Sequence, residues 1–124
     1  MAAPNIRNLT SMIGKTATVA LSTTNATSIV SNAAASGKVF KVNSLYAANV
    51  DGTDACNVTV SVYSEDDIGG TAYAVASTID IPADSTLVVI TKDEPIYLEE
   101  DKSIGATAET ADDLVIVASY EEIS

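Results

Sequence analysis

The short period of the apolar residues is the feature that most constrains the fold of this chain. In residues 56–63 (CNVTVSVY) the apolar side chains recur at every second position from Cys56 to Val62, and polar side chains lie between them. Successive side chains of a strand point to opposite faces, so this pattern predicts a strand with one buried face. Cys56 falls on the apolar face and is expected to be a small core residue. Val, Ile and Thr are frequent and Trp is absent, which favours strands throughout.

Similar segments recur along the chain, separated by sequences typical of turns such as STTN, DGTD and PADS. The candidate strands are residues 15–21, 26–31, 38–50, 56–63, 71–81, 86–91, 96–98, 103–108 and 114–122. No segment has the length and period of an ordinary helix. The pattern predicts an all-β fold, an antiparallel β-sandwich or jelly-roll-like domain of about nine strands. A chain of 124 residues forms one domain. We expect the sandwich to span residues 15–124, preceded by an extended N-terminal arm over residues 1–14.

Three candidate strands carry more detailed expectations. The alternation in residues 38–50 breaks after Val42, which predicts a bulge or a change of sheet near Ser44. Residues 71–81 are expected to place four apolar side chains on one face. These are Tyr73, Val75, Ile79 and Ile81. Residues 86–91 (TLVVIT) form a continuous apolar run, which predicts a strand buried on both faces.

Five carboxylates occur within residues 92–101 (KDEPIYLEED). They are Asp93, Glu94, Glu99, Glu100 and Asp101. They flank the short candidate strand 96–98, in which Ile96 and Leu98 are expected to face the core and Tyr97 the opposite side. The carboxylates therefore form two separate rims, which we expect to be solvated. Acidic loops can also bind calcium, but none here matches the EF-hand pattern D-x-[DN]-x-[DN]-G.

The residue inventory disfavours an enzyme. The sequence has no histidine and one cysteine, so His/Cys catalysis and a Cys-based zinc site are excluded. No G-x-S-x-G or S-x-x-K motif supports a serine nucleophile. Paired carboxylates are available, but a glycosidase usually also offers Trp and Tyr platforms to the sugar, and aromatic residues make up only 5% of the chain. We expect a non-enzymatic protein that needs no cofactor and no metal.

The charge is large and unevenly distributed. The net charge of −11 argues against a nucleic-acid partner. Residues 1–50 carry four cations and no acid, whereas residues 51–124 carry all 17 acids and two lysines. Either the acidic part simply faces solvent, or the first part docks on an acidic surface. The N-terminus lacks the apolar region of a signal peptide, and no segment is long enough to span a membrane, so no membrane partner is expected.

The expected N-terminal arm is the best candidate for a partner-binding segment. It combines apolar side chains with one cation, a composition that can add to the sheet edge or groove of another protein. The candidate partner-binding residues are Ile6, Arg7, Leu9, Met12 and Ile13. The alternative is a frayed terminus without a partner.

The chain resembles small virion structural proteins of tailed bacteriophages, especially those of marine cyanophages. The resemblance rests on residues 38–50 (KVFKVNSLYAANV) with Asp51-Gly52-Thr53, on residues 79–104, on the ending ASYEEIS, and on residues 3–17. These are motifs of a fold and not catalytic signatures. The family typically has a glycine in the turn after Y-L-E-E, where this chain has Asp101-Lys102.

The resemblance implies a multi-copy β-sandwich protein of a phage particle, located in the virion and assembled in the bacterial cytoplasm. A head decoration (cement) protein is the first expectation: a homotrimer that binds the major capsid protein or another virion protein. A neck, tail or fibre-attachment component is the alternative within the virion. A calcium- or sugar-binding lectin-like module is the alternative outside it.

Overall fold

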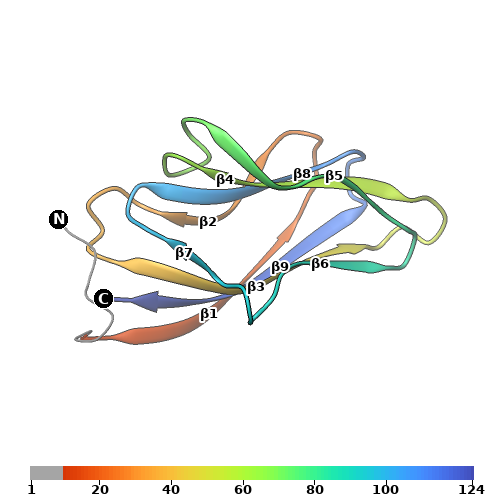
Figure 1. The fold of residues 1–124 in the computed structure, drawn as a ribbon. Helices are drawn as coiled ribbons and strands as arrows, with labels where there is room; N and C mark the ends of the chain where they lie inside the picture. The colour runs from red at the N-terminus through yellow and green to blue at the C-terminus, as the bar shows by residue number, and fades with distance from the viewer. Residues whose placement is uncertain (1–9) are drawn as a thin grey trace.

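The computed structural model describes residues 10–124, which form nine strands in two sheets. The strands are β1 (Met12–Ala20), β2 (Thr27–Asn32), β3 (Val39–Asn49), β4 (Cys56–Tyr63), β5 (Ala72–Ile81), β6 (Thr86–Ile90), β7 (Ile96–Leu98), β8 (Lys102–Ala108) and β9 (Leu114–Ile123). Sheet A has the order β1-β9-β3-β6, with β7 also paired to β3, and sheet B has the order β2-β8-β4-β5. Figure 1 shows the two sheets as the two layers of a sandwich. The all-β sandwich expected from the sequence is confirmed.

The strand pairing is that of a jelly roll. Within each sheet, strands from the two halves of the chain pair antiparallel: β1 with β9, β2 with β8, β3 with β6 and β7, and β4 with β5. The chain thus resembles one long hairpin wound around the core. The links β9–β3 and β8–β4 then join these pairs into sheets. An eight-stranded jelly roll results when β6 and β7 are taken as one interrupted strand.

The core lies between the two sheets and is made of the alternate side chains that the sequence pattern predicts. Val58, Val60 and Cys56 of β4 are fully buried, as are Leu114 and Ile116 of β9. Burial of such side chains removes apolar surface from water and is the main stabilising contribution to a fold of this kind. Ile96 and Leu98 of β7 also face inward, whereas Tyr97 is exposed, as expected.

The expected bulge in β3 is present. The register between β3 and β9 shifts between Val42 and Ser44, and the register between β3 and β6 shifts between Leu45 and Tyr46. Phe40 and Val42 lie on the buried side before the shift, and Leu45 and Ala47 lie on it afterwards. The irregularity therefore restores the apolar face after the break in the sequence pattern.

The expectation that residues 86–91 are buried on both faces is wrong. In sheet A of the described chain β6 is an edge strand, and Val88 is 49% exposed while Ile90 is buried. A continuous apolar run does not distinguish a central strand from an edge strand whose outer face lacks a covering layer.

The expected apolar face of β5 is only partly correct. Ile81 is buried, but Tyr73 and Ile79 remain exposed, and Val75 lies where the register with β4 shifts. A second shift near Thr78, which has a positive φ of 46°, also interrupts the alternation. Because β5 is an edge strand in the described structure, its bulges are the kind of irregularity that discourages edge-to-edge pairing.

Two buried asparagines connect the sheets at opposite ends of β3. At one end, the side-chain amide of Asn32 in sheet B donates to the carbonyl of Leu98 in sheet A, at 3.0 Å. At the other end, the amide of Asn49 in sheet A donates to the carbonyl of Ile81 in sheet B, at 2.9 Å. Among the described residues, no buried side-chain nitrogen or oxygen lacks a hydrogen-bond partner. Each asparagine amide therefore donates to a backbone carbonyl of the opposite sheet and is itself satisfied in the core.

Candidate interaction surface

The beginning and end of the described chain meet at one corner of sheet A, here called the terminal corner: residues 10–15, Lys38 and residues 120–124. The backbone amides of Thr10 and Ser11 donate to the carbonyl of Ser124, and the amide of Ser124 donates back to the carbonyl of Ser11. Figure 1 shows the C-terminus beside the start of β1. The first and last described residues are therefore hydrogen-bonded to each other at this corner.

The structure places the candidate partner-binding residues in two groups. Ile6, Arg7 and Leu9 lie outside the described residues. Met12 and Ile13 lie in β1, which begins three residues before the position expected for the first strand, and they pair with Ile123 and Glu122. The sequence pattern missed this extension because Gly14 and the apolar pair before it do not alternate.

β1 presents an accessible edge. Its only strand partner in the described structure is β9, so its other edge is unpaired. Met12 and Ile13 are 51% and 50% exposed, and most of the remaining strand is also exposed. Lys15 is the only charged residue in β1. An exposed, nearly uncharged edge strand is the kind of surface to which a strand of another protein can add.

Glu122 forms ion pairs with two lysines at the terminal corner. Its carboxylate accepts hydrogen bonds from the ammonium groups of Lys15, at 2.9 Å, and Lys38, at 2.5 Å. Glu122 is nearly buried, whereas the two lysine side chains are partly exposed. The bonds to Lys38 and Lys15 hold the pKa of Glu122 below its ordinary value, and the same contact raises the pKa of Lys15. Two cations of the acid-free first part of the chain are thus used within the molecule to hold β1 and the start of β3 against β9.

We expect this ion-pair cluster to make stability depend on pH. Because folding lowers the pKa of Glu122, its contribution is present above the ordinary value of 4.5 and is lost as the pH falls through the lower folded value. Glu122→Gln should lower the free energy of unfolding by about 1 kcal/mol at pH 7, since both lysines are partly exposed and screened. Urea unfolding of both proteins between pH 7 and pH 3 measures the difference.

The difference in the free energy of unfolding between the wild-type protein and Glu122→Gln should become smaller as the pH falls, whatever the other carboxylates contribute. The carboxylate of Asp113, whose pKa is raised by desolvation and by Asp51, Asp54 and Asp112, acts in the opposite direction in both proteins and cancels from the comparison. A difference that stays constant down to pH 3 would contradict the role assigned to the Glu122 charge.

Part of the acidic run around residues 92–101 has a structural role that the sequence did not indicate. Asp93, Glu94 and Glu99 are exposed as expected. However, the Glu100 carboxylate accepts the backbone amide of Gly37 at 3.2 Å, and that of Asp101 accepts the amide of Asp66 at 3.1 Å. The second rim is therefore not merely solvated.

The loop of residues 64–70 closes over the outer face of sheet B. Its Ile68 amide donates to the hydroxyl of Ser103, and that hydroxyl donates to the carbonyl of Glu65. The backbone of Gly105 lies so close to this loop that an added Cβ would meet the Ile68 side chain at 2.7 Å. These contacts tie the acidic loop to β8.

Within residues 10–124, no group of three or more Asp, Glu, His or Cys residues is placed to hold a metal ion. In the Asp51 turn the carboxylate instead accepts the backbone amide and the hydroxyl of Thr53, both at 3.0 Å, which lowers its pKa. Residues 10–124 contain no helix that is long and apolar enough to cross a membrane.

Comparison with known proteins identifies a structural neighbour. No protein-family model matches the sequence, and no curated protein matches it. A chain in the acidic stable capsid structure of Helicobacter pylori bacteriophage KHP30 has a TM-score of 0.51 and 12% identity, with 94% of this chain and 90% of that chain covered. This fold also occurs in a phage capsid.

The second neighbour is more distant. A chain in the structure of infectious bursal disease virus strain Gx has a TM-score of 0.33 and 13% identity, and the match covers 90% of this chain but 32% of that chain. At 12% identity the KHP30 match establishes a shared fold alone, and it covers nearly the full length of both chains.

Proposed function

We propose that this chain is a non-enzymatic structural protein of a phage particle, and that it is a decoration (cement) protein that binds the assembled head as a homotrimer. The observation that carries the proposal is the near full-length match of fold to a chain in a phage capsid structure. The resemblance of the sequence to small phage virion proteins points the same way.

The terminal corner is the proposed attachment point. The unpaired edge of β1 carries Met12 and Ile13 in exposed positions, and it bears one charge in a chain whose net charge is −11. A strand of the shell protein can add to such an edge through backbone hydrogen bonds, which do not require an opposite charge. We extend the proposal to Ile6, Arg7 and Leu9, which precede β1 in the sequence.

Heads assembled with and without the chain test the function. Heads that lack it should lose heat resistance while keeping their tails, and added protein should restore the resistance. A decoration protein should be present in hundreds of copies per particle, as counted by quantitative gel analysis or mass spectrometry. A few tens of copies, together with loss of tails, would instead indicate a neck or tail component.

Two changes at the terminal corner test the attachment point. Deleting residues 1–9 should abolish binding to heads in co-sedimentation, and the truncated protein should still unfold cooperatively because β1 is retained. Ile13→Ser should weaken binding, whereas Tyr73→Ser, a matched change of an exposed apolar residue on the edge strand β5, should not. Unchanged binding of both the truncated and Ile13→Ser proteins would remove the terminal corner from the proposal.

A further inference from the structure

Three irregularities interrupt sheet A close to the middle of β3. The strand opposite β3 is broken between Ile90, the end of β6, and Ile96, the start of β7. At the same level β3 shifts register against β9 and against β6. Pro95 precedes β7, and because proline has no backbone N–H it cannot donate to a strand ladder. Bulges and breaks that coincide in this way commonly re-aim side chains next to a binding site.

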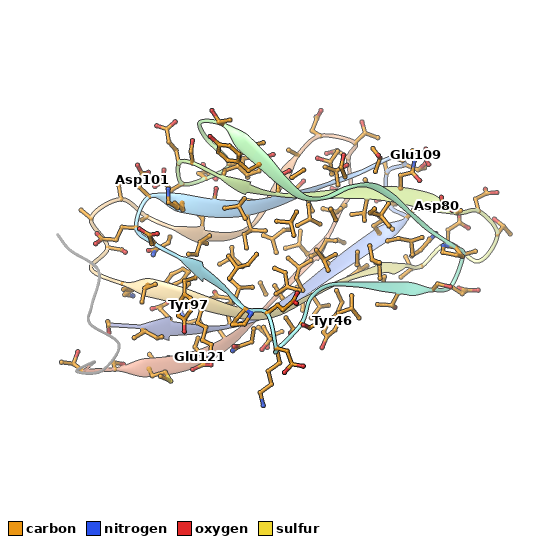
Figure 2. The ribbon with its side chains drawn as sticks, viewed as in Figure 1. Tyr46, Asp80, Tyr97, Asp101, Glu109 and Glu121 are labelled. Carbon is orange, nitrogen blue, oxygen red and sulfur yellow. The ribbon has the colours of Figure 1, made fainter. Side chains whose placement is uncertain are left out.

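The break opens a hollow of about 540 Å³ on the outer face of sheet A. Tyr46 and Val88, which pair across β3 and β6, form an apolar wall and are 39% and 49% exposed. Figure 2 shows Tyr46 on the side of sheet A away from sheet B. Asn43, at the bulge, also lines the hollow. The hollow thus combines exposed apolar surface with hydrogen-bonding groups, as ligand sites do.

Lysines outnumber carboxylates in the hollow, although the net charge of the chain is −11. Lys41 and Lys92 line it together with one carboxylate, that of Glu121, which accepts a hydrogen bond from the Asn43 amide at 2.8 Å. Both ion pairs found among the described residues are made by Glu122, so neither Lys41 nor Lys92 takes part in one. Two ammonium groups that make no salt bridge among the described residues lie beside an apolar wall, and together they match a carboxylate adjacent to a large apolar side chain.

We propose that this hollow binds an acidic peptide segment of the capsid shell protein, with a carboxylate between Lys41 and Lys92 and a neighbouring apolar side chain against Tyr46 and Val88. The inference rests on the proposed function. It assigns a second contact to the same sheet that carries β1, so sheet A faces the particle. The net charge of −11 repels an acidic partner elsewhere on the molecule, which makes the hollow a determinant of how the protein is oriented on the head.

Binding of purified variants to heads assembled without the chain tests the inference. Lys41→Gln with Lys92→Gln should weaken binding about tenfold in co-sedimentation, since each accessible ion pair accounts for a few-fold in affinity. Lys41→Arg with Lys92→Arg keeps both charges and should bind within about threefold of the wild type. Lys102→Gln is the matched control, because Lys102 lies in sheet B and also takes part in no ion pair among the described residues. Raising the salt concentration should remove the difference between the wild type and the double glutamine variant.

The possible outcomes separate the inference from the proposed function. Equal binding by the wild type and the double glutamine variant would show that the hollow is not a binding site, and it would leave the proposed function unaffected. No binding by the wild type would overturn the function itself. Equal losses in the glutamine and control variants would show a general charge effect and overturn the hollow. Sedimentation analysis tests whether the hollow instead binds a second copy of this chain. If the wild type forms an oligomer and the double glutamine variant does not, the hollow is a contact between copies and the inference fails. Lys92→Gln alone changes an exposed loop residue, so it should lower binding without any change in thermal stability.

Discussion

Replacing Asn32 with alanine is expected to lower the free energy of unfolding by about 3 kcal/mol and the melting temperature by roughly 10 °C. The Asn32 side chain is fully buried. Its amide donates to the carbonyls of Lys38, at 2.9 Å, and Leu98, at 3.0 Å, and its oxygen accepts the Ser36 hydroxyl at 2.6 Å. The alanine variant would leave these groups without a partner where water has little access, and each such loss costs about 1–3 kcal/mol.

Asn57→Ala is the matched control for this prediction. Asn57 lies in β4 with a half-buried side chain that makes one hydrogen bond, to the exposed carboxylate of Glu109 at 3.2 Å. Water can replace that bond, so the change should stay within about 0.5 kcal/mol. Urea and thermal unfolding of both variants provide the comparison. Similar stability of the two variants would mean that the connection between the sheets at Asn32 is not needed.

Replacing Ile116 with alanine should lower the free energy of unfolding by about 2–5 kcal/mol. Ile116 is fully buried in β9, the second strand of sheet A, where it pairs with Val19 of β1 and Ala47 of β3. The small neighbour at position 47 leaves little material to fill the space that is vacated, so a cavity should remain. Ile116→Val removes one methylene and should cost about 0.5–1.5 kcal/mol.

The neighbouring position offers the control for Ile116. Val117 points to the opposite face of β9 and is only partly buried, so Val117→Ala should cost clearly less than Ile116→Ala. Denaturant unfolding measured by circular dichroism distinguishes them. An equal loss at both positions would show that the outer face of sheet A is covered as well as the inner face.

The fold could be predicted from the sequence to the level of its strands because the apolar period is local. The alternation of residues 56–63 and the break at Ser44 both appear in the structure as β4 and the β3 bulge. Burial on the second face could not be predicted this way, since it depends on what lies across a sheet. This is why Val88 and Tyr73 are exposed although their segments are strongly apolar.

The candidate site was only partly accessible to sequence reasoning. The surface around Met12 and Ile13 was found because an apolar stretch without acids is a local property. The partners of Glu122 could not be found from the sequence, because Lys15 and Lys38 lie 107 and 84 positions away in the chain. The hollow of Lys41 and Lys92 was missed for the same reason, as it forms only when the break between β6 and β7 lies beside the β3 bulge.

The pairing of β1 with β9 determines when sheet A can form during synthesis of the chain. These are the first and last strands of the described chain, and Thr10 and Ser11 bond to Ser124 at the end of the chain. During synthesis, β1 therefore lacks this strand partner until residues 114–123 have left the ribosome. Pairing between such distant segments is slow because a long loop must close first. Sheet A should therefore be completed only after β9 has been synthesised, and nascent chains stalled before residue 114 should be the species most prone to aggregation.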